Sequence, residues 1–228
     1  MVRGSLKFFF TSLTFAVSFA VQAQPRVLIS AFEPFGGRRE NATQEILREF
    51  TRLWEESAPE SRTFDLGGVV VPVAYDFAEQ ELARKMDSFQ PDIVLSLGEA
   101  PEGAVRLEEM ARNRDDSPFA DNRGVARMDE KIVEDGPNTY KTRLPIKVLE
   151  QALKKQNISV RRSRDAGAYL CNHLFYQLMH FVNTESDFKS VRAGFIHFPA
   201  ESIEDTPDYP ERGASTLGVI LRTILQNL

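Results

Sequence analysis

The sequence predicts an α/β fold in which a mainly parallel or mixed central sheet lies between two layers of helices. Short runs rich in β-branched residues alternate along the chain with segments of helical periodicity, which is typical of parallel strands joined by crossover helices. The run 92–98 (DIVLSLG) is almost continuously apolar, as expected for a strand that is covered on both faces. The 228 residues are enough for one large domain with a sizeable core. Together these features favour a three-layer α/β/α sandwich.

The elements of this sandwich can be assigned in chain order. Strands are expected at 26–32, 67–75, 92–98, 158–165 and 191–198, and helices at 42–56, 76–89, 146–156, 171–181 and 214–226. Asn41 can cap the first helix, in which Ile46 and Phe50 recur at helical spacing. The segment 99–144 is irregular and rich in Asp, Asn, Arg and Gly. It is too long for a plain connection, so it is expected to be functional or to contain a hairpin.

The first 23 residues have the layout of a secretory signal peptide. Arg3 and Lys7 precede an uncharged apolar run over 8–21, and small residues occupy the last and third-last positions of the sequence that ends at Ala23. The run is shorter than the roughly 20 apolar residues that a membrane span needs. An uncleaved anchor and a buried first helix are the alternatives. We expect cleavage after Ala23, a periplasmic or secreted single domain over 24–228, and no membrane contact after cleavage.

Charge and motif content exclude several classes of function. The formal net charge is −5 and the Lys and Arg residues are spread evenly, so nothing favours a nucleic acid or a membrane surface as partner. The sequence contains no HExxH, CxxC or GxSxG motif, and the glycine pair at 36–37 does not complete a phosphate-binding loop. No metal site is expected. A homo-oligomer is compatible with the sequence.

The only cysteine, Cys171, is expected in the first turn of a helix. Unpaired backbone N–H groups and the positive end of the helix dipole favour a thiolate there and can hold an oxyanion. The pKa of the thiol is therefore expected below its free value of about 8.5. An inert buried cysteine is the commoner role of a free thiol. The position alone leaves both roles open.

A nucleophilic cysteine needs a base and a group that orients the base. His197 ends a predicted strand just before Pro199, at the carboxyl edge where reactive groups gather in such sheets, and is the best candidate for the base. His173 is too close in sequence to turn back onto Cys171. Four carboxylates after the strand 92–98 could orient the imidazole, and physical reasoning alone does not choose among them: Glu108, Glu109, Asp115 and Asp116.

Several motifs in the same order resemble the pyroglutamyl peptidase I family of cysteine peptidases, also called pyrrolidone-carboxylate peptidases. The matching stretches are AFEPFGG (31–37), NRDDSPFADNRG (113–124), EDGPNTY (134–140), LPIK (144–147), DAGAYLCNH (165–173) and GFIHFP (194–199). The resemblance implies a fold similar to that of purine nucleoside phosphorylases. It also implies removal of N-terminal pyroglutamyl residues from peptides, without a cofactor.

The resemblance implies roles for individual residues. Cys171 matches the family nucleophile and His197 the family histidine. Glu108 matches the family glutamate because it lies five residues before Asn113 in Asn-x-Asp-Asp, whereas a gap-free alignment from Gly98 would give Glu109. The residues implied in substrate binding are Phe35, Asn41, Glu99 and Tyr169.

Two departures from the family pattern bear on function. Glu99 replaces a Gln that faces the lactam in many members, and a carboxylate accepts hydrogen bonds but does not donate them. Pro118 occupies the position of an Arg that assists the oxyanion, for which Arg112, Arg114 or Arg123 could substitute. These departures support an alternative function, an exported, non-catalytic binder of pyroglutamyl peptides or related lactams.

Overall fold

A computed structural model describes residues 23–101, 103–201 and 203–228. Apart from Ala23, the expected signal peptide lies outside these described residues. Among the residues described, no helix is long and apolar enough to cross a membrane.

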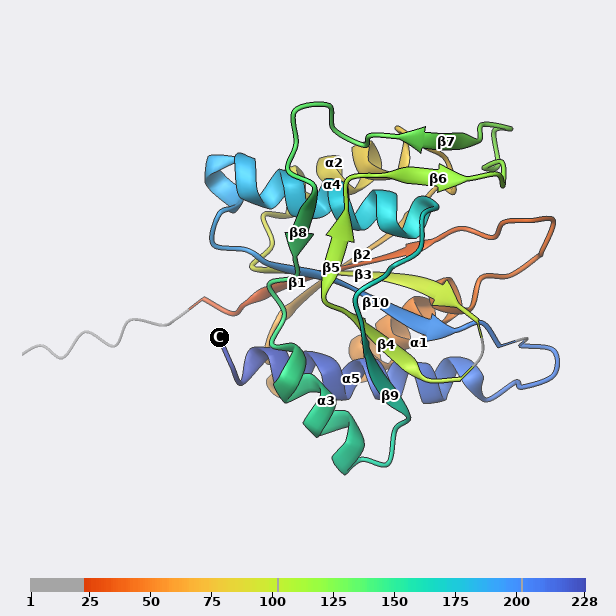
Figure 1. Cartoon of the computed structure of the whole chain (residues 1–228). Coiled ribbons are helices and arrows are strands. Elements are labelled where there is room, and N and C mark those ends of the chain that lie inside the picture. The colour runs from red at the N-terminus through yellow and green to blue at the C-terminus, as the bar shows by residue number, and fades with distance from the viewer. Residues whose placement is uncertain (1–22, 102, 202) are drawn as a thin grey trace, which may run out of the picture.

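The centre of the molecule is a six-stranded sheet with the strand order β2-β1-β3-β10-β4-β9 (Figure 1). Neighbouring strands run parallel except for β10 and β4, which are antiparallel. The sheet is therefore mixed and carries helices, which confirms the predicted α/β class. The strands are β1 (Arg26–Phe32), β2 (Asp65–Val71), β3 (Ile93–Ala100), β4 (Val105–Glu108), β9 (Val160–Ser163) and β10 (Arg192–Pro199).

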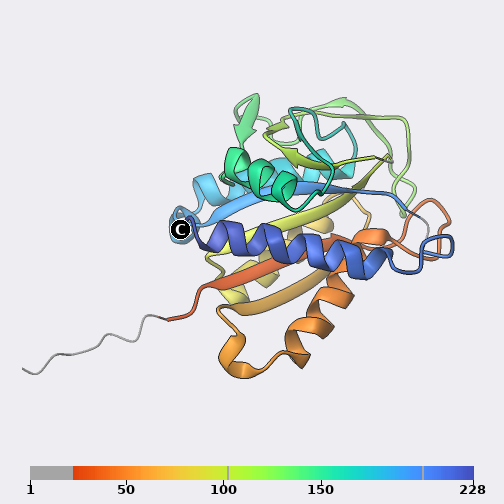
Figure 2. The same cartoon turned by 90° about the horizontal axis from the view of Figure 1, so that it is seen from below.

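Helices cover both faces of the sheet (Figures 1 and 2). One face carries α1 (Ala42–Glu56), α3 (Ile146–Lys155) and α5 (Tyr209–Leu225), and the other carries α2 (Ala78–Phe89) and α4 (Leu170–Thr184). Each layer has its own apolar core. Val27 and Ile29 of β1 belong to the first core and Leu28 to the second, because successive side chains of a strand point to opposite faces.

Several predicted boundaries are shifted, and two of them by four or more residues. The strand expected to reach residue 75 ends at Val71, directly before Pro72, which has no N–H to donate to a neighbouring strand. The last helix begins at Tyr209 rather than at 214, with Pro210 in its first turn. Proline is tolerated there because N–H groups of the first turn have no intrahelical acceptor.

The irregular segment 99–144 contains four short strands besides β4. β5 (Met110–Arg112) pairs antiparallel with β8 (Thr139–Lys141), and β6 (Asp115–Ser117) with β7 (Arg127–Glu130). The hairpin expected in this segment is thus present. These small sheets pack beside the start of α4, which carries Cys171.

Candidate active site

Cys171 lies in the first turn of α4. The helix follows Tyr169, whose backbone is extended (φ −108°, ψ −163°) and whose side chain makes no capping hydrogen bond among the described residues. The first backbone N–H of the helix to bond within it is that of His173, which donates to the Tyr169 carbonyl at 3.1 Å. Helix geometry leaves the N–H groups of Cys171 and Asn172 without intrahelical acceptors. They are donors available to a ligand at this end of α4.

Asn172 fixes this helix end against β5. Its carboxamide accepts from the N–H of Arg112 at 2.9 Å and donates to the carbonyls of Arg112 and Arg114 at 2.9 and 3.0 Å. Asn172 is fully buried, so these bonds are shielded from water. Because Asn172 follows Cys171 directly, these hydrogen bonds to the backbone of Arg112 and Arg114 also fix the position of the thiol.

Gly98 makes room for the thiol beside His197. A Cβ at position 98 would lie 3.0 Å from Sγ of Cys171, which is closer than ordinary contact. Gly98 of β3 is also the register partner of His197 on β10. Cys171 and His197 thus both lie next to Gly98, and both line the same pocket.

Glu108 holds the imidazole. Its Oε1 lies 2.8 Å from Nδ1 of His197, and both side chains are buried. Glu109, one residue further, instead lies 3.3 Å from Arg162 on the exposed side. The structure places Glu108, and not Glu109, against the histidine. With Nδ1 engaged by the carboxylate, Nε2 is the ring nitrogen available to the thiol.

The thiol is not acidified, contrary to the sequence-based expectation. Burial, and after it the charges of Glu99 and Glu108, raise the pKa of Cys171 to about 12. The sequence places the helix dipole at the thiol but does not reveal that two carboxylates converge on it. These effects favour the thiol over the thiolate in the free protein.

The pocket that contains Cys171 and His197 has a volume of about 550 Å³. Phe35, Glu99 and Tyr169 also line it, as the resemblance implies. The guanidinium of Arg38 lies over the ring of Phe35, with its carbon 4.4 Å from the ring centroid. Arg38 also forms an ion pair with Glu99, whose Oε1 accepts from the N–H of Ala42 at 2.6 Å. The carboxylate of Glu99 is thus held by two donors before a ligand binds.

Asn41 is not among the residues that line the pocket. Its Oδ1 accepts from the N–H of Thr43 at 2.9 Å, as the cap of α1, and its Nδ2 donates to the Glu33 carbonyl at 3.2 Å. It therefore ties α1 to the loop that carries Phe35. This is a supporting position.

None of the three arginines considered as oxyanion donors lines the pocket. Arg112 pairs with Asp165, Arg114 with carboxylates of β6 and β7, and Arg123 stacks over Phe77. The arginines in the pocket lining are instead Arg106, Arg161 and Arg162. Sequence reasoning missed them because they come from β4 and β9, whose pairing was not predicted.

Comparison with known proteins decides the family. A profile of the family described as pyroglutamyl peptidase matches residues 25–220. The chain belongs to the pyroglutamyl peptidase family. It is 36% identical over 204 residues to the pyrrolidone-carboxylate peptidase of Yersinia pestis, covering 86% of this chain and 89% of that protein.

Solved structures of family members superpose closely on this chain. The pyroglutamyl peptidase I of Bacillus amyloliquefaciens is 28% identical, with a TM-score of 0.78 over 88% of this chain and 95% of that one. The pyrrolidone carboxyl peptidase of Thermococcus litoralis is 30% identical, also with a TM-score of 0.78, over 89% of this chain and 94% of that one.

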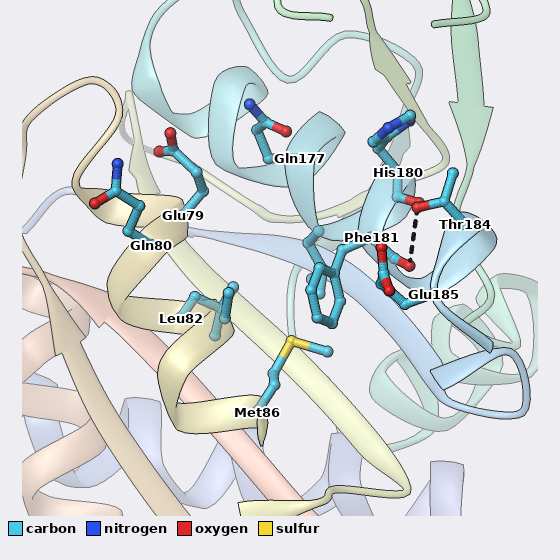
Figure 3. Close-up of a pocket in the computed structure, with 11 residues that line it drawn as sticks. Glu79, Gln80, Leu82, Met86, Gln177, His180, Phe181, Thr184 and Glu185 are labelled. Atoms are coloured by element: carbon cyan, nitrogen blue, oxygen red, sulfur yellow. Dashed lines mark hydrogen bonds between the residues drawn. The ribbon is translucent and has the colours of Figure 1, made fainter. Parts of the chain in front are cut away.

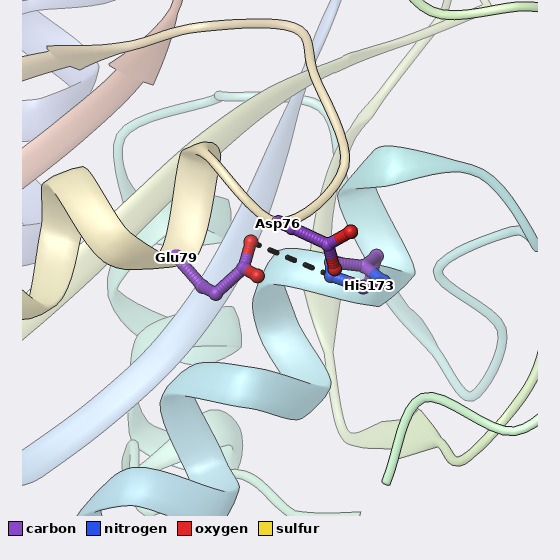
Figure 4. Close-up of side chains that lie close together, drawn as sticks. All are labelled: Asp76, Glu79 and His173. Atoms are coloured by element: carbon purple, nitrogen blue, oxygen red, sulfur yellow. Dashed lines mark ion pairs between the residues drawn. The ribbon is translucent and has the colours of Figure 1, made fainter. Parts of the chain in front are cut away.

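This pyroglutamyl peptidase family member has a second polar cluster around His173, two residues after Cys171 in α4. Nδ1 of His173 lies 2.8 Å from Asp115, and Nε2 lies 3.5 Å from Glu79, with Asp76 adjacent (Figure 4). Burial lowers the pKa of His173, but the two paired carboxylates outweigh it and raise the pKa to about 9. An imidazolium has no free lone pair with which to bind a metal. His173 is thus a buried cation that joins α4 to α2.

A separate hollow of about 220 Å³ lies between α2 and α4 (Figure 3). Leu82, Met86 and Phe181 form its apolar wall, and Glu79 lies at one end. It contains none of the predicted site residues.

Proposed function

We propose that the chain removes an N-terminal pyroglutamyl residue from peptides through an acyl-enzyme intermediate. The observation that carries this proposal is the convergence of Cys171, His197 and Glu108 at one pocket of a pyroglutamyl peptidase family member. A nucleophile, a base and a group that orients the base are the parts that covalent acyl transfer requires.

In the first step Nε2 of His197 takes the thiol proton while Sγ of Cys171 attacks the pyroglutamyl carbonyl carbon. The N–H groups of Cys171 and Asn172 hold the resulting oxyanion. Glu108 stabilises the imidazolium that forms. The tetrahedral intermediate then collapses as the C–N bond breaks, and the imidazolium protonates the departing amine.

In the second step His197 takes a proton from water, and the hydroxide attacks the thioester. The C–S bond breaks, pyroglutamate is released, and the proton returns from the imidazolium to Sγ of Cys171. The proton that first leaves the sulfur departs with the amine, and a proton from water replaces it on Sγ. The enzyme is thus regenerated, and the reaction needs no cofactor.

The pyroglutamyl ring is flat, neutral and partly apolar, and it fits a wall made by Phe35 and Tyr169. Glu99 supplies an acceptor for the lactam N–H. Because Arg38 and the N–H of Ala42 already bind Glu99, this carboxylate is oriented before the substrate arrives. This orientation lets a glutamate serve where many family members have a glutamine.

Turnover of a chromogenic pyroglutamyl amide tests the function. The purified protein should hydrolyse the amide, and Cys171→Ala should abolish the reaction while the circular dichroism spectrum stays unchanged. If the protein binds pyroglutamate but hydrolyses the amide no faster than a blank without enzyme, its function is binding and not catalysis.

We further infer that the protein is exported and begins at Gln24 after cleavage. The charged start, the apolar run over 8–21 and the small residues before the cut support this. Mass spectrometry of the protein from its native host should give an N-terminus at Gln24, in the periplasmic or extracellular fraction. Recovery of a cytoplasmic form that retains Met1 would overturn the inference.

A further inference from the structure

Four residues from four strands form a row across the sheet beneath the active-site pocket. Gly98 on β3 is the register partner of His197 on β10, His197 is the partner of Arg106 on β4, and Arg106 is the partner of Arg161 on β9. Register partners point to the same face of a sheet, and neighbouring strands are about 4.8 Å apart. Arg106 therefore follows the base by one strand, and Arg161 by two.

The pyroglutamyl pocket lies on the opposite side of His197. Phe35 follows β1 and Glu99 belongs to β3, and the strand order is β1-β3-β10-β4-β9. A substrate with its ring over β1 and β3 and its scissile bond at β10 must extend its leaving peptide over β4 and β9. That is the side on which Arg106 and Arg161 line the pocket.

Neither guanidinium forms an ion pair among the described residues, although the charge of Glu108 acts on Arg106 from a distance. Other charged side chains of the pocket are paired, Arg162 with Glu109 and Glu150 and Asp165 with Arg112. Within the described part of the chain, the guanidinium of Arg106 donates to the Pro101 carbonyl alone, at 3.4 Å. Burial, and after it the charge of Arg161, lower the pKa of Arg106. Like charges on neighbouring strands are unfavourable, and an anion between them would remove that cost.

We propose that Arg106 and Arg161 form a subsite for a carboxylate of the leaving peptide. The carboxylate is either the side chain of an acidic residue that follows pyroglutamate or the free C-terminus of a pyroglutamyl dipeptide. Both present two oxygens to a guanidinium in the same bidentate geometry. This assignment rests on the proposed function and narrows it to acidic pyroglutamyl peptides.

Matched peptides test the subsite. The amidated peptides pyroglutamyl-Glu-Ala and pyroglutamyl-Gln-Ala differ only in charge, and pyroglutamyl-Ala as free acid and as amide tests the C-terminal carboxylate. At low salt we expect kcat/KM to favour each anionic member by about 2- to 5-fold, the range of exposed ion pairs. The preference should fall in 0.5 M NaCl, where the Debye length is only about 4 Å. A preference confined to one pair of peptides identifies the source of the carboxylate.

Variants assign the preference to these residues. Arg161→Gln should at least halve the preference, and the double variant with Arg106→Gln should abolish it. Arg164→Gln is the matched control, because Arg164 is exposed on the same segment but does not line the pocket. Equal kcat/KM for anionic and neutral peptides, or an equal loss of preference in Arg164→Gln, would overturn the subsite.

A binding measurement keeps the test independent of catalysis. In the Cys171→Ala protein, calorimetry of the same intact peptides should give the same ratio of dissociation constants. If no pyroglutamyl substrate is turned over but the ratio persists, the proposed function fails and the subsite stands. If all the peptides are cleaved and bound equally, the function stands and the subsite fails.

Discussion

Replacement of Gly98 by alanine tests whether the active site depends on the space at this position. The new Cβ would lie 2.7 Å from Cζ of Phe195 and 3.0 Å from Sγ of Cys171. Phe195 is fully buried, so the overlap forces the core to shift, and overpacking of this kind costs about 1–3 kcal/mol of unfolding free energy. A displacement of the reacting thiol by about 1 Å should lower kcat on the order of 100-fold.

Urea unfolding gives the free-energy change, and turnover of a pyroglutamyl amide gives kcat. Gly68→Ala is the matched control in the same sheet, because its Cβ would lie 3.6 Å from Leu47, an ordinary contact. The control should change stability by less than about 0.5 kcal/mol and leave kcat unaltered. If Gly98→Ala matches the control in both measurements, the close approach of Cys171 to β3 is refuted.

The remaining predictions concern the charged groups around the thiol and behind it. Glu108→Gln should lower kcat about 100-fold because the imidazolium loses its counter-charge, whereas Glu109→Gln should stay within twofold of wild type; the reverse result would restore the Glu109 alignment. Because the pKa of Cys171 is raised, its alkylation by iodoacetamide should accelerate with pH beyond pH 9, and Glu99→Gln should move the curve to lower pH; a plateau below pH 8 would contradict this. The folded-state pKa of His173, about 9, lies above its unfolded value of about 6.5, so its stabilisation is complete below pH 6.5 and is lost as the pH rises through 9, by up to about 3 kcal/mol. Urea unfolding at pH 6 and pH 9.5 measures that loss of stability, and His173→Gln should have no such difference between the two pH values. A rise in Tm with Zn²⁺ that is absent from His173→Gln would instead make the cluster a metal site.

The central strands could be predicted from sequence because helices cover both of their faces. Most of their side chains are apolar in both directions, so β1, β3 and β10 appear as largely apolar runs. The strands of the 99–144 segment could not be located. Three of them have only three residues, which is too short for a period of two to be recognised.

Glu108 shows how an uncertainty of one residue near the end of a strand limits prediction from sequence. Successive residues of a strand face opposite sides, so an error of one position exchanges Glu108 for Glu109. The structure settles the register: Leu107 points into the first core, Glu108 points to His197, and Glu109 lies beyond the end of β4. The aligned motif at Asn113 favoured the residue that the structure places against His197, but the local pattern alone left both open.

The raised pKa of Cys171 and the proposed mechanism are compatible because the proton goes to His197 and not to solvent. Loss of the proton to solvent would leave an unpaired thiolate beside two carboxylates, which is why the thiol is weakly acidic. Transfer to the imidazole forms an ion pair instead, and Glu108 stabilises its positive member from 2.8 Å. The neutral thiol is thus favoured in the free enzyme, and oxidants attack thiolates in preference to thiols. If the protein is exported to an oxidising compartment, as we propose, a nucleophile that is ionised only when the substrate is bound would protect Cys171, the proposed nucleophile, from oxidation.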